Sequence, residues 1–169
     1  MTNTLEIKLL SEDATMPKRN HDTDAGYDIY SAETVVLEPQ EKAIIKTDVA
    51  VNIPKGYVGL LTSRSGVSSK THLVIETGKI DAGFTGNMGI NIKNDAQKNS
   101  LKSSVTRNIK GERIYVYRDF HEVDTYVINK GDRLAQLVIV PIWTPELMQV
   151  EEFESETARG EKGFGSSGV

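Results

Sequence analysis

The chain has 169 residues, 38% of them hydrophobic, which is the size of one domain able to bury most of its apolar surface. It contains no cysteine, which excludes disulfides and thiolate zinc sites, and its net charge of −4 gives no overall attraction for nucleic acids. No apolar run is long enough to span a bilayer, and the N-terminus lacks a signal-peptide pattern. We therefore expect a cytoplasmic protein with no nucleic-acid or membrane partner.

Short apolar stretches rich in β-branched residues recur along the chain, separated by turn signals such as "PKG", "AGFTGN" and "NKGD". In chain order they are "LEIKLL", "TVVLEP", "KAIIKTDVAVNIP", "GYVGLLTS", "MGINI", "ERIYVYR", "TYVIN" and "RLAQLVIVPI". The pattern predicts an all-β sandwich or barrel, with at most a turn or two of helix after "SRSG". The nearly continuous apolar run "RLAQLVIVPI" predicts a strand buried on both faces, inside the core or at a subunit interface.

One polar segment, "KNDAQKNSLKSSVTRNIKGER", interrupts the series of predicted strands and is poor in strand-forming residues. Between positions 95 and 113 it has five Lys or Arg and two Asp or Glu, a surplus of +3 in an acidic protein. Long segments of this kind are usually functional or disordered. We interpret positions of about 95-117 as an insertion between two strands, either a solvated hairpin or a site for a partner.

Four polar clusters lie at expected strand ends: "DAGYDIYSAE", "SRSGVSSK", "GKIDAGFTGNMG" and "GDRLAQL". The guanidinium, hydroxyls and glycine N–H of "SRSG" suit a phosphate group, although a simple turn has the same composition. Asp81 follows a β-branched residue and precedes two small ones, so its carboxylate either projects into open space or caps a turn. Asp28, in a predicted strand, is either functional or makes a structural hydrogen bond.

The C-terminal "GFGSSG" matches the dinucleotide-binding pattern G-x-G-x-x-G. That pattern works only where a strand leads into a helix, and Val169 follows directly. We therefore reject a Rossmann site and expect a flexible arm at 159-169, following a β domain at 1-158.

Taken in order and spacing, "AGYDIYSA", "SRSG", "GKIDAGFTGNMG", "GDRLAQL" and "RGEKGFGSSG" resemble the five motifs of the trimeric dUTPase family, over nearly the whole chain. The resemblance implies a jelly-roll-like β-barrel and a homotrimer with active sites at subunit interfaces. It also implies Mg²⁺-dependent hydrolysis of dUTP to dUMP and pyrophosphate, which lowers dUTP and supplies dUMP for thymidylate synthesis.

The resemblance also assigns roles to individual residues. Asp81 is the catalytic residue, holding the water that attacks the α-phosphate and contacting the sugar 3′-hydroxyl. Asp28 faces the water shell of a magnesium ion held mainly by the triphosphate. The implied substrate-binding residues are Arg64, Ser65, Gly66 and Gln136 for phosphates, Gly78, Lys79, Ile80, Phe84 and Gly89 for the nucleoside, and Arg159, Phe164, Gly165 and Ser166 in the arm.

Two features depart from the common family pattern. Phe84 stands where the family usually has tyrosine, so the apolar face under the deoxyribose is kept and the hydroxyl is lost. The insertion is similar to that of phage-encoded dUTPases, some of which bind a bacterial repressor of a mobile pathogenicity island. The alternatives are a regulatory protein-binding module on a dUTPase fold and a related dCTP deaminase.

Overall fold

The structure is a computed structural model that describes residues 4–116 and 119–153. Its strands are β1 Glu6–Leu9, β2 Gly26–Tyr30, β3 Val35–Leu37, β4 Lys42–Lys46, β5 Val49–Asn52, β6 Tyr57–Ser63, β7 Leu73–Ile75, β8 Gly78–Ile80, β9 Gly89–Asn94, β10 Lys102–Ser103, β11 Val105–Arg107, β12 Arg113–Tyr115, β13 His121–Glu122, β14 Tyr126–Ile128 and β15 Arg133–Pro141. The only helix in these residues is the single turn α1, Ser65–Ser68. The predicted all-β fold is confirmed, and so is the short helix after "SRSG".

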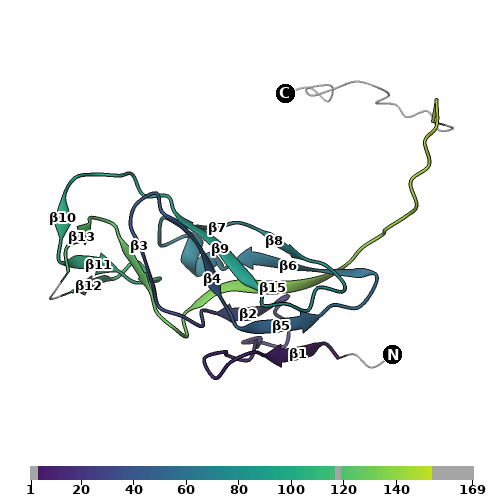
Figure 1. The fold of residues 1–169 in the computed structure, drawn as a ribbon, viewed down its shortest axis with the longest axis horizontal. Helices are drawn as coiled ribbons and strands as arrows, with labels where there is room; N and C mark the ends of the chain where they lie inside the picture. The colour runs from purple at the N-terminus through teal and green to yellow at the C-terminus, as the bar shows by residue number, and fades with distance from the viewer. Residues whose placement is uncertain (1–3, 117–118, 154–169) are drawn as a thin grey trace.

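The sheet that positions the polar clusters has the strand order β2-β15-β6-β8 (Figure 1). Its longest strand, β15, pairs antiparallel with β2 on one side and β6 on the other. Leu134, Ala135 and Leu137 are fully buried, as predicted for "RLAQLVIVPI", whereas Ile139 and Val140 stay half-exposed in the single chain. The second half of the strand is therefore available for contact with another chain.

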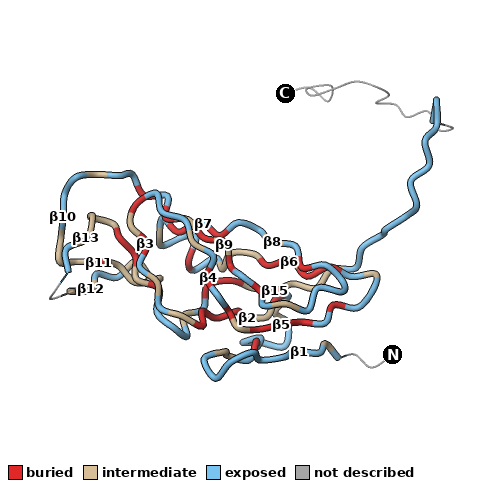
Figure 2. Tube along the Cα trace, in the orientation of Figure 1, coloured by how far each residue is buried: buried red, intermediate tan, exposed pale blue. Residues whose placement is uncertain are grey.

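Two further sheets, β4-β9-β7 and β12-β11-β14-β3, pack with the first around one apolar core (Figure 2). Ile29 and Leu61 of the first sheet share this core with Ile45, Ile90 and Ile128 of the other two. Each such side chain contributes about 1.5–3 kcal/mol when it is removed from water. Burial alternates along these strands: in β9, Ile90, Ile92 and Asn94 are buried, while the residues between them are exposed or half-buried. This alternation is what a strand with one face on the core produces.

The insertion lies between β9 and β14, as predicted, but it is more ordered than its polar composition suggests. It forms the hairpin β11–β12, and β11 also pairs in parallel with β14, which extends the sheet by two strands. Ala96 and Thr106 are buried, and Arg107 Nε donates a 2.7 Å hydrogen bond to Asp124. Replacing the whole of 95-117 would therefore remove part of the packed structure.

After β15 the chain leaves the body as an extended segment, residues 142–153 (Figure 1). Its large apolar side chains are exposed, including Trp143 at 87%, Leu147 at 97% and Phe153 at 87%. A monomer gains nothing from such a row of exposed apolar side chains, so the segment is a candidate for contact with another chain. No helix in the described ranges is long and apolar enough to cross a membrane.

Candidate active site

Asp28 is the centre of a buried polar cluster. Its side chain is 1% exposed, and each carboxylate oxygen accepts two hydrogen bonds. Arg64 Nε (2.8 Å) and Gln136 Nε2 (3.2 Å) donate to Oδ1, and Asn20 Nδ2 (3.0 Å) and Arg133 Nη1 (3.3 Å) donate to Oδ2. One carboxylate thus fixes the direction of two guanidinium groups and two amides.

The charge state of Asp28 follows from these contacts. Burial raises the pKa of its carboxyl, but the hydrogen bond from Gln136, the charge of Arg64 and the hydrogen bond from Asn20 outweigh that effect. The pKa is therefore held below its ordinary value, and the group is an anion at neutral pH. Because all four donors already occupy its oxygens, Asp28 is not arranged as a direct metal ligand.

The sheet register brings this cluster together. Gln136 on β15 pairs with Asp28 on β2 and with Thr62 on β6, so the three stand in one row across the sheet. Arg64 directly follows β6 and begins the turn that becomes α1. Ser65 and Gly66 come next and are exposed, and a Cβ added to Gly66 would meet nothing within 4 Å. Open space for a phosphate group therefore adjoins the ordered donors.

Asp81 lies in a different place, at the first position of a tight turn that follows β8. The N–H of Phe84 donates to the Asp81 carbonyl at 3.1 Å, and Gly83 has φ +91°, which a glycine adopts without strain. The Asp81 side chain is exposed, and it accepts no hydrogen bond from another group in the described residues. Its carboxylate is thus free to hold a water molecule.

The other predicted nucleoside residues surround this turn. Ile80 is buried, Gly78 is half-buried, and Lys79 and Gly89 are exposed. The Phe84 ring is 45% exposed, and a Cβ at Gly86 would lie 2.8 Å from the end of the ring, so a larger residue at position 86 would push the ring aside. The apolar ring is therefore presented at the surface of the hairpin, where a sugar could rest on it.

Within one chain the two clusters are far apart. Ile80 pairs with Gly59, which places Asp81 level with Val58, near the start of β6, whereas Arg64 follows the end of that strand. Six residues of strand span about 20 Å. A single chain therefore holds the phosphate-binding cluster and Asp81 at opposite ends of one strand.

Two members of the Asp28 cluster were missing from the predicted site residues. Arg133 belongs to the quoted "GDRLAQL", so its motif was recognised but not its contact with Asp28. Asn20 lies in the polar stretch before β2, and nothing in the sequence around it indicated that its amide contacts Asp28. The predicted arm residues Arg159, Phe164, Gly165 and Ser166 lie outside the described residues, and their roles stay predictions.

A sequence model of the dUTPase family matches residues 12–104 and 95–168. A deoxyuridine 5'-triphosphate nucleotidohydrolase of Mycobacterium marinum is 37% identical over 174 residues, covering 99% of this chain and 97% of the relative. The chain therefore belongs to the dUTPase family, and its activity is the family's hydrolysis of dUTP.

Solved structures of phage proteins are more similar still. A dUTPase of Staphylococcus bacteriophage 80alpha, in a tyrosine-to-phenylalanine variant with dUpNHpp, is 72% identical, with a TM-score of 0.96 and coverage of 99% of this chain and 100% of that one. The dUTPase of phage phi11 of S. aureus, described as showing a species-specific insert, is 72% identical, with a TM-score of 0.88 and coverage of 91% and 100%. The chain is thus of the phage type within its family.

Proposed function

We propose that the chain cleaves dUTP at the α-phosphorus with a water molecule held by Asp81, releasing dUMP and pyrophosphate. The observation that carries this proposal is the Asp28 cluster, which orders Arg64 and Gln136 beside the open space at Gly66. Ordered cationic and amide donors stabilise the charge that builds on phosphate oxygens as the leaving group departs. Asp81 takes the proton of the attacking water.

The proposal needs a second copy of the chain, because Asp81 and Arg64 are separated by about 20 Å of strand in one copy. We infer a homotrimer in which Asp81 of one subunit faces the Asp28 cluster of another. The half-exposed end of β15 and the apolar segment 142–153 support such an assembly, as does Ile44, which is 71% exposed. Closed cyclic assemblies bury the same surface on every copy.

Magnesium fits this site as part of the substrate complex. The described residues contain no group of three or more His, Asp or Glu side chains arranged to hold a metal, and Asp28 is saturated by its donors. The triphosphate would therefore supply most of the ligands. Asp28 would accept hydrogen bonds from the ion's water shell only where one of its four present donors gives way, because its carboxylate is buried and fully hydrogen-bonded. When bound, the ion neutralises charge on the leaving pyrophosphate. A related phage phi11 dUTPase structure is described as coordinating a structural Mg(II) ion.

We propose that the hairpin around Asp81 binds the uracil and deoxyribose of dUTP. Backbone N–H and C=O groups between Gly78 and Gly89 read the uracil edge, where cytosine would present the opposite donor pattern. Phe84 packs under the deoxyribose without the hydroxyl that a tyrosine would add. The arm at 159-169 closes over the nucleotide, with Phe164 on the uracil and Arg159 and Ser166 on the terminal phosphate.

The direct test is pyrophosphate release from dUTP with magnesium, comparing the wild type with Asp81→Asn. The amide keeps the shape of the side chain but cannot accept the proton of the water, so kcat should fall by about 10²-fold or more while the affinity for a non-hydrolysable analogue changes little. A kcat near the wild-type value would remove Asp81 from the mechanism. The same assay with dCTP separates this proposal from the deaminase alternative, which the family match does not favour.

A second function is supported by the surface of the insertion region. Leu101, Tyr115 and Phe120 are 66–72% exposed there, beside Lys102 and Arg113. Related phage 80alpha dUTPases are described as controlling transfer of virulence genes by a G protein-like mechanism. We propose that this surface binds a protein partner, a bacterial repressor, under control of the bound nucleotide.

Point substitutions test this second function better than deletion, because Ala96 and Thr106 are packed. Tyr115→Ala and Phe120→Ala should weaken binding of the repressor, measured by calorimetry with and without a non-hydrolysable dUTP analogue, while dUTP hydrolysis stays close to normal. The exposed Val74→Ala on β7 is the matched control. Unchanged repressor affinity in both aromatic variants would leave the insertion as a structural hairpin.

A further inference from the structure

The loop before β2, residues 18–24, is fixed at several points although most of it is exposed. Lys18 forms an isolated bridge with Asp28, whose N–H donates to the Lys18 carbonyl at 2.8 Å. Asp24 Oδ2 accepts hydrogen bonds from the backbone N–H of Asn20 at 3.2 Å and from that of the next residue at 3.0 Å, so its side chain closes a turn. The loop therefore holds the backbone of Asn20 in place beside the buried carboxylate.

The side-chain amide of Asn20 uses both of its ends on the Asp28 cluster. Its Nδ2 donates to Asp28 Oδ2 at 3.0 Å, and its Oδ1 accepts a hydrogen bond from Arg133 Nη1 at 3.2 Å. Arg133 Nη1 also donates to Asp28 Oδ2 at 3.3 Å, so the three groups form a closed triangle of hydrogen bonds. Both contacts of Asn20 need a side chain that carries a donor and an acceptor, and a carboxylate has no donor.

Arg133 is held less firmly by Asp28 than Arg64 is. The Arg133 side chain is 43% exposed and its contact with Asp28 is 3.3 Å long, whereas the Arg64 side chain is 23% exposed and its contact is 2.8 Å long. A long side chain with one weak contact keeps more of its rotamers, and a second contact removes some of them. Asn20 supplies that second contact, so the direction of the Arg133 guanidinium depends on it.

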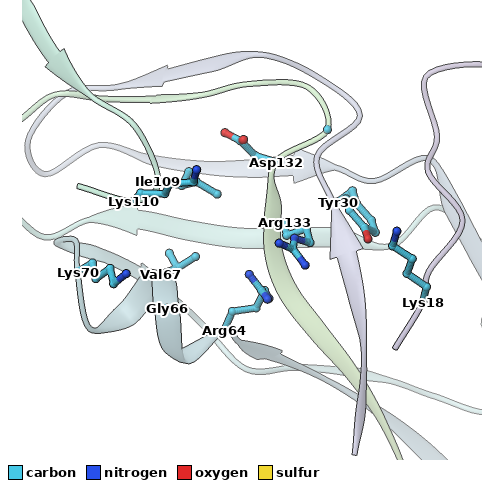
Figure 3. Close-up of a pocket in the computed structure, with 11 residues that line it drawn as sticks. Lys18, Tyr30, Arg64, Gly66, Val67, Lys70, Ile109, Lys110, Asp132 and Arg133 are labelled. Carbon is cyan, nitrogen blue, oxygen red and sulfur yellow. The ribbon is translucent and has the colours of Figure 1, made fainter. Parts of the chain in front are cut away.

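Arg133 and Arg64 line the same pocket, which lies between α1, the turn before β15 and the insertion. Figure 3 shows their guanidinium groups next to each other in this pocket, and both groups bond to the Asp28 carboxylate. Asn20 does not line the pocket. It therefore acts on the pocket through the residues that it holds.

We propose that Asn20 is a positioning residue for the hydrolysis of dUTP, which fixes the guanidinium of Arg133 against Asp28 without touching the nucleotide. Donors that are already ordered stabilise developing charge better than donors that must reorganise during the reaction. Asn20 provides this order for the more exposed of the two guanidinium groups. The inference rests on the proposed function, because it adds a residue to the same reaction.

The test is steady-state pyrophosphate release from dUTP with magnesium, using the full-length protein. Asn20→Ala should lower kcat/KM about tenfold, because the Arg133 guanidinium loses its alignment. Asn20→Asp should lose at least as much although its shape is nearly the same, because a carboxylate cannot donate to Asp28 and adds a second negative charge beside it. Wild-type kcat/KM in either variant would overturn the proposal.

The matched control is Asn52→Ala. Asn52 Nδ2 donates to a carboxylate oxygen of Glu6 at 2.6 Å, and the two residues lie opposite each other on β5 and β1. The control therefore removes a hydrogen bond of the same chemical kind, from asparagine to a carboxylate, outside the Asp28 cluster. It should keep the wild-type kcat/KM, and a loss equal to that of Asn20→Ala would contradict a specific role for Asn20.

A double-mutant cycle shows whether Asn20 acts through Arg133. Once Arg133→Ala has removed the guanidinium, adding Asn20→Ala should lower kcat/KM by less than about threefold, because the group that Asn20 positions is already absent. A further loss of about threefold or more would mean that Asn20 acts by another route, and the proposal would be wrong.

Thermal unfolding separates positioning from a structural role. Because Asn20 is exposed, Asn20→Ala should lower Tm by less than about 2 °C. A Tm as low as that of Asp28→Asn would assign Asn20 to the stability of the cluster and contradict the proposal. Failure of the proposed function would appear differently, because the wild type itself would then release no pyrophosphate from dUTP.

Discussion

The Asp28→Asn substitution tests how the phosphate-binding cluster is held together. Asp28 is 1% exposed and accepts hydrogen bonds from Arg64, Arg133, Gln136 and Asn20. Asparagine has nearly the same shape but no charge, and its amide would point two hydrogens at groups that are themselves donors. The two guanidinium groups would lose their shared counter-charge.

The size of the effect follows from burial. Removing one partner of a fully buried ion pair costs about 3–5 kcal/mol. The side chains of Arg64 and Arg133 are 23% and 43% exposed, so water recovers part of this loss. We expect a loss of about 3 kcal/mol, which for a chain of this size lowers Tm by about 6–12 °C.

Thermal unfolding at one fixed protein concentration measures this loss, since an oligomer's Tm depends on concentration. The matched control is Asp13→Asn, which removes a 2.6 Å pair with Lys130 in which both side chains are 54% exposed. That pair should contribute less than about 1 kcal/mol. If Asp28→Asn and Asp13→Asn unfold at the same temperature, the cluster does not depend on the buried carboxylate and the reasoning is wrong.

Three further outcomes are expected. The folded pKa of Asp28 is depressed, so its stabilisation is present above the ordinary pKa of 3.8 and is lost as pH falls through the lower folded value. The wild type should therefore lose more stability in acid titrations than Asp28→Asn does. Gly66→Ala should keep the wild-type Tm, since nothing lies within 4 Å of the added methyl group. The variant should bind a dUTP analogue more weakly, because the methyl group would occupy the space proposed for a phosphate. Equal affinity in the variant and the wild type would show that no phosphate binds in that space. Removing 159-169 should reduce dUTP turnover strongly while size-exclusion chromatography still shows a folded oligomer, and normal turnover would contradict a closing arm.

The strand pattern was predictable from the sequence because β-branched residues and turn signals act locally. The hairpin β11–β12 was less so, since its polar strands are stabilised by pairing with β14 rather than by an apolar face of their own. The prediction of an insertion between two strands was confirmed, whereas its packing through Ala96 and Thr106 was not foreseen.

In the candidate site, too, the residue types were predictable from local sequence, whereas their spatial arrangement was not. Local motifs identified Asp28, Arg64 and Gln136, but their convergence joins positions 36 and 108 residues apart and depends on sheet register. The register also separates Asp81 from Arg64 by about 20 Å, which no local motif could reveal.

Mixing two inactive variants tests the shared site most directly. Asp81→Asn and Arg64→Ala each remove one half of the proposed site, and every mixed trimer regains one intact site where a chain with Asp81 faces a chain with Arg64. Random assembly from equal amounts should restore about a quarter of wild-type pyrophosphate release from dUTP. Mixed trimers verified by native mass spectrometry that stay inactive would contradict a site built from Asp81 of one subunit and the Asp28 cluster of another.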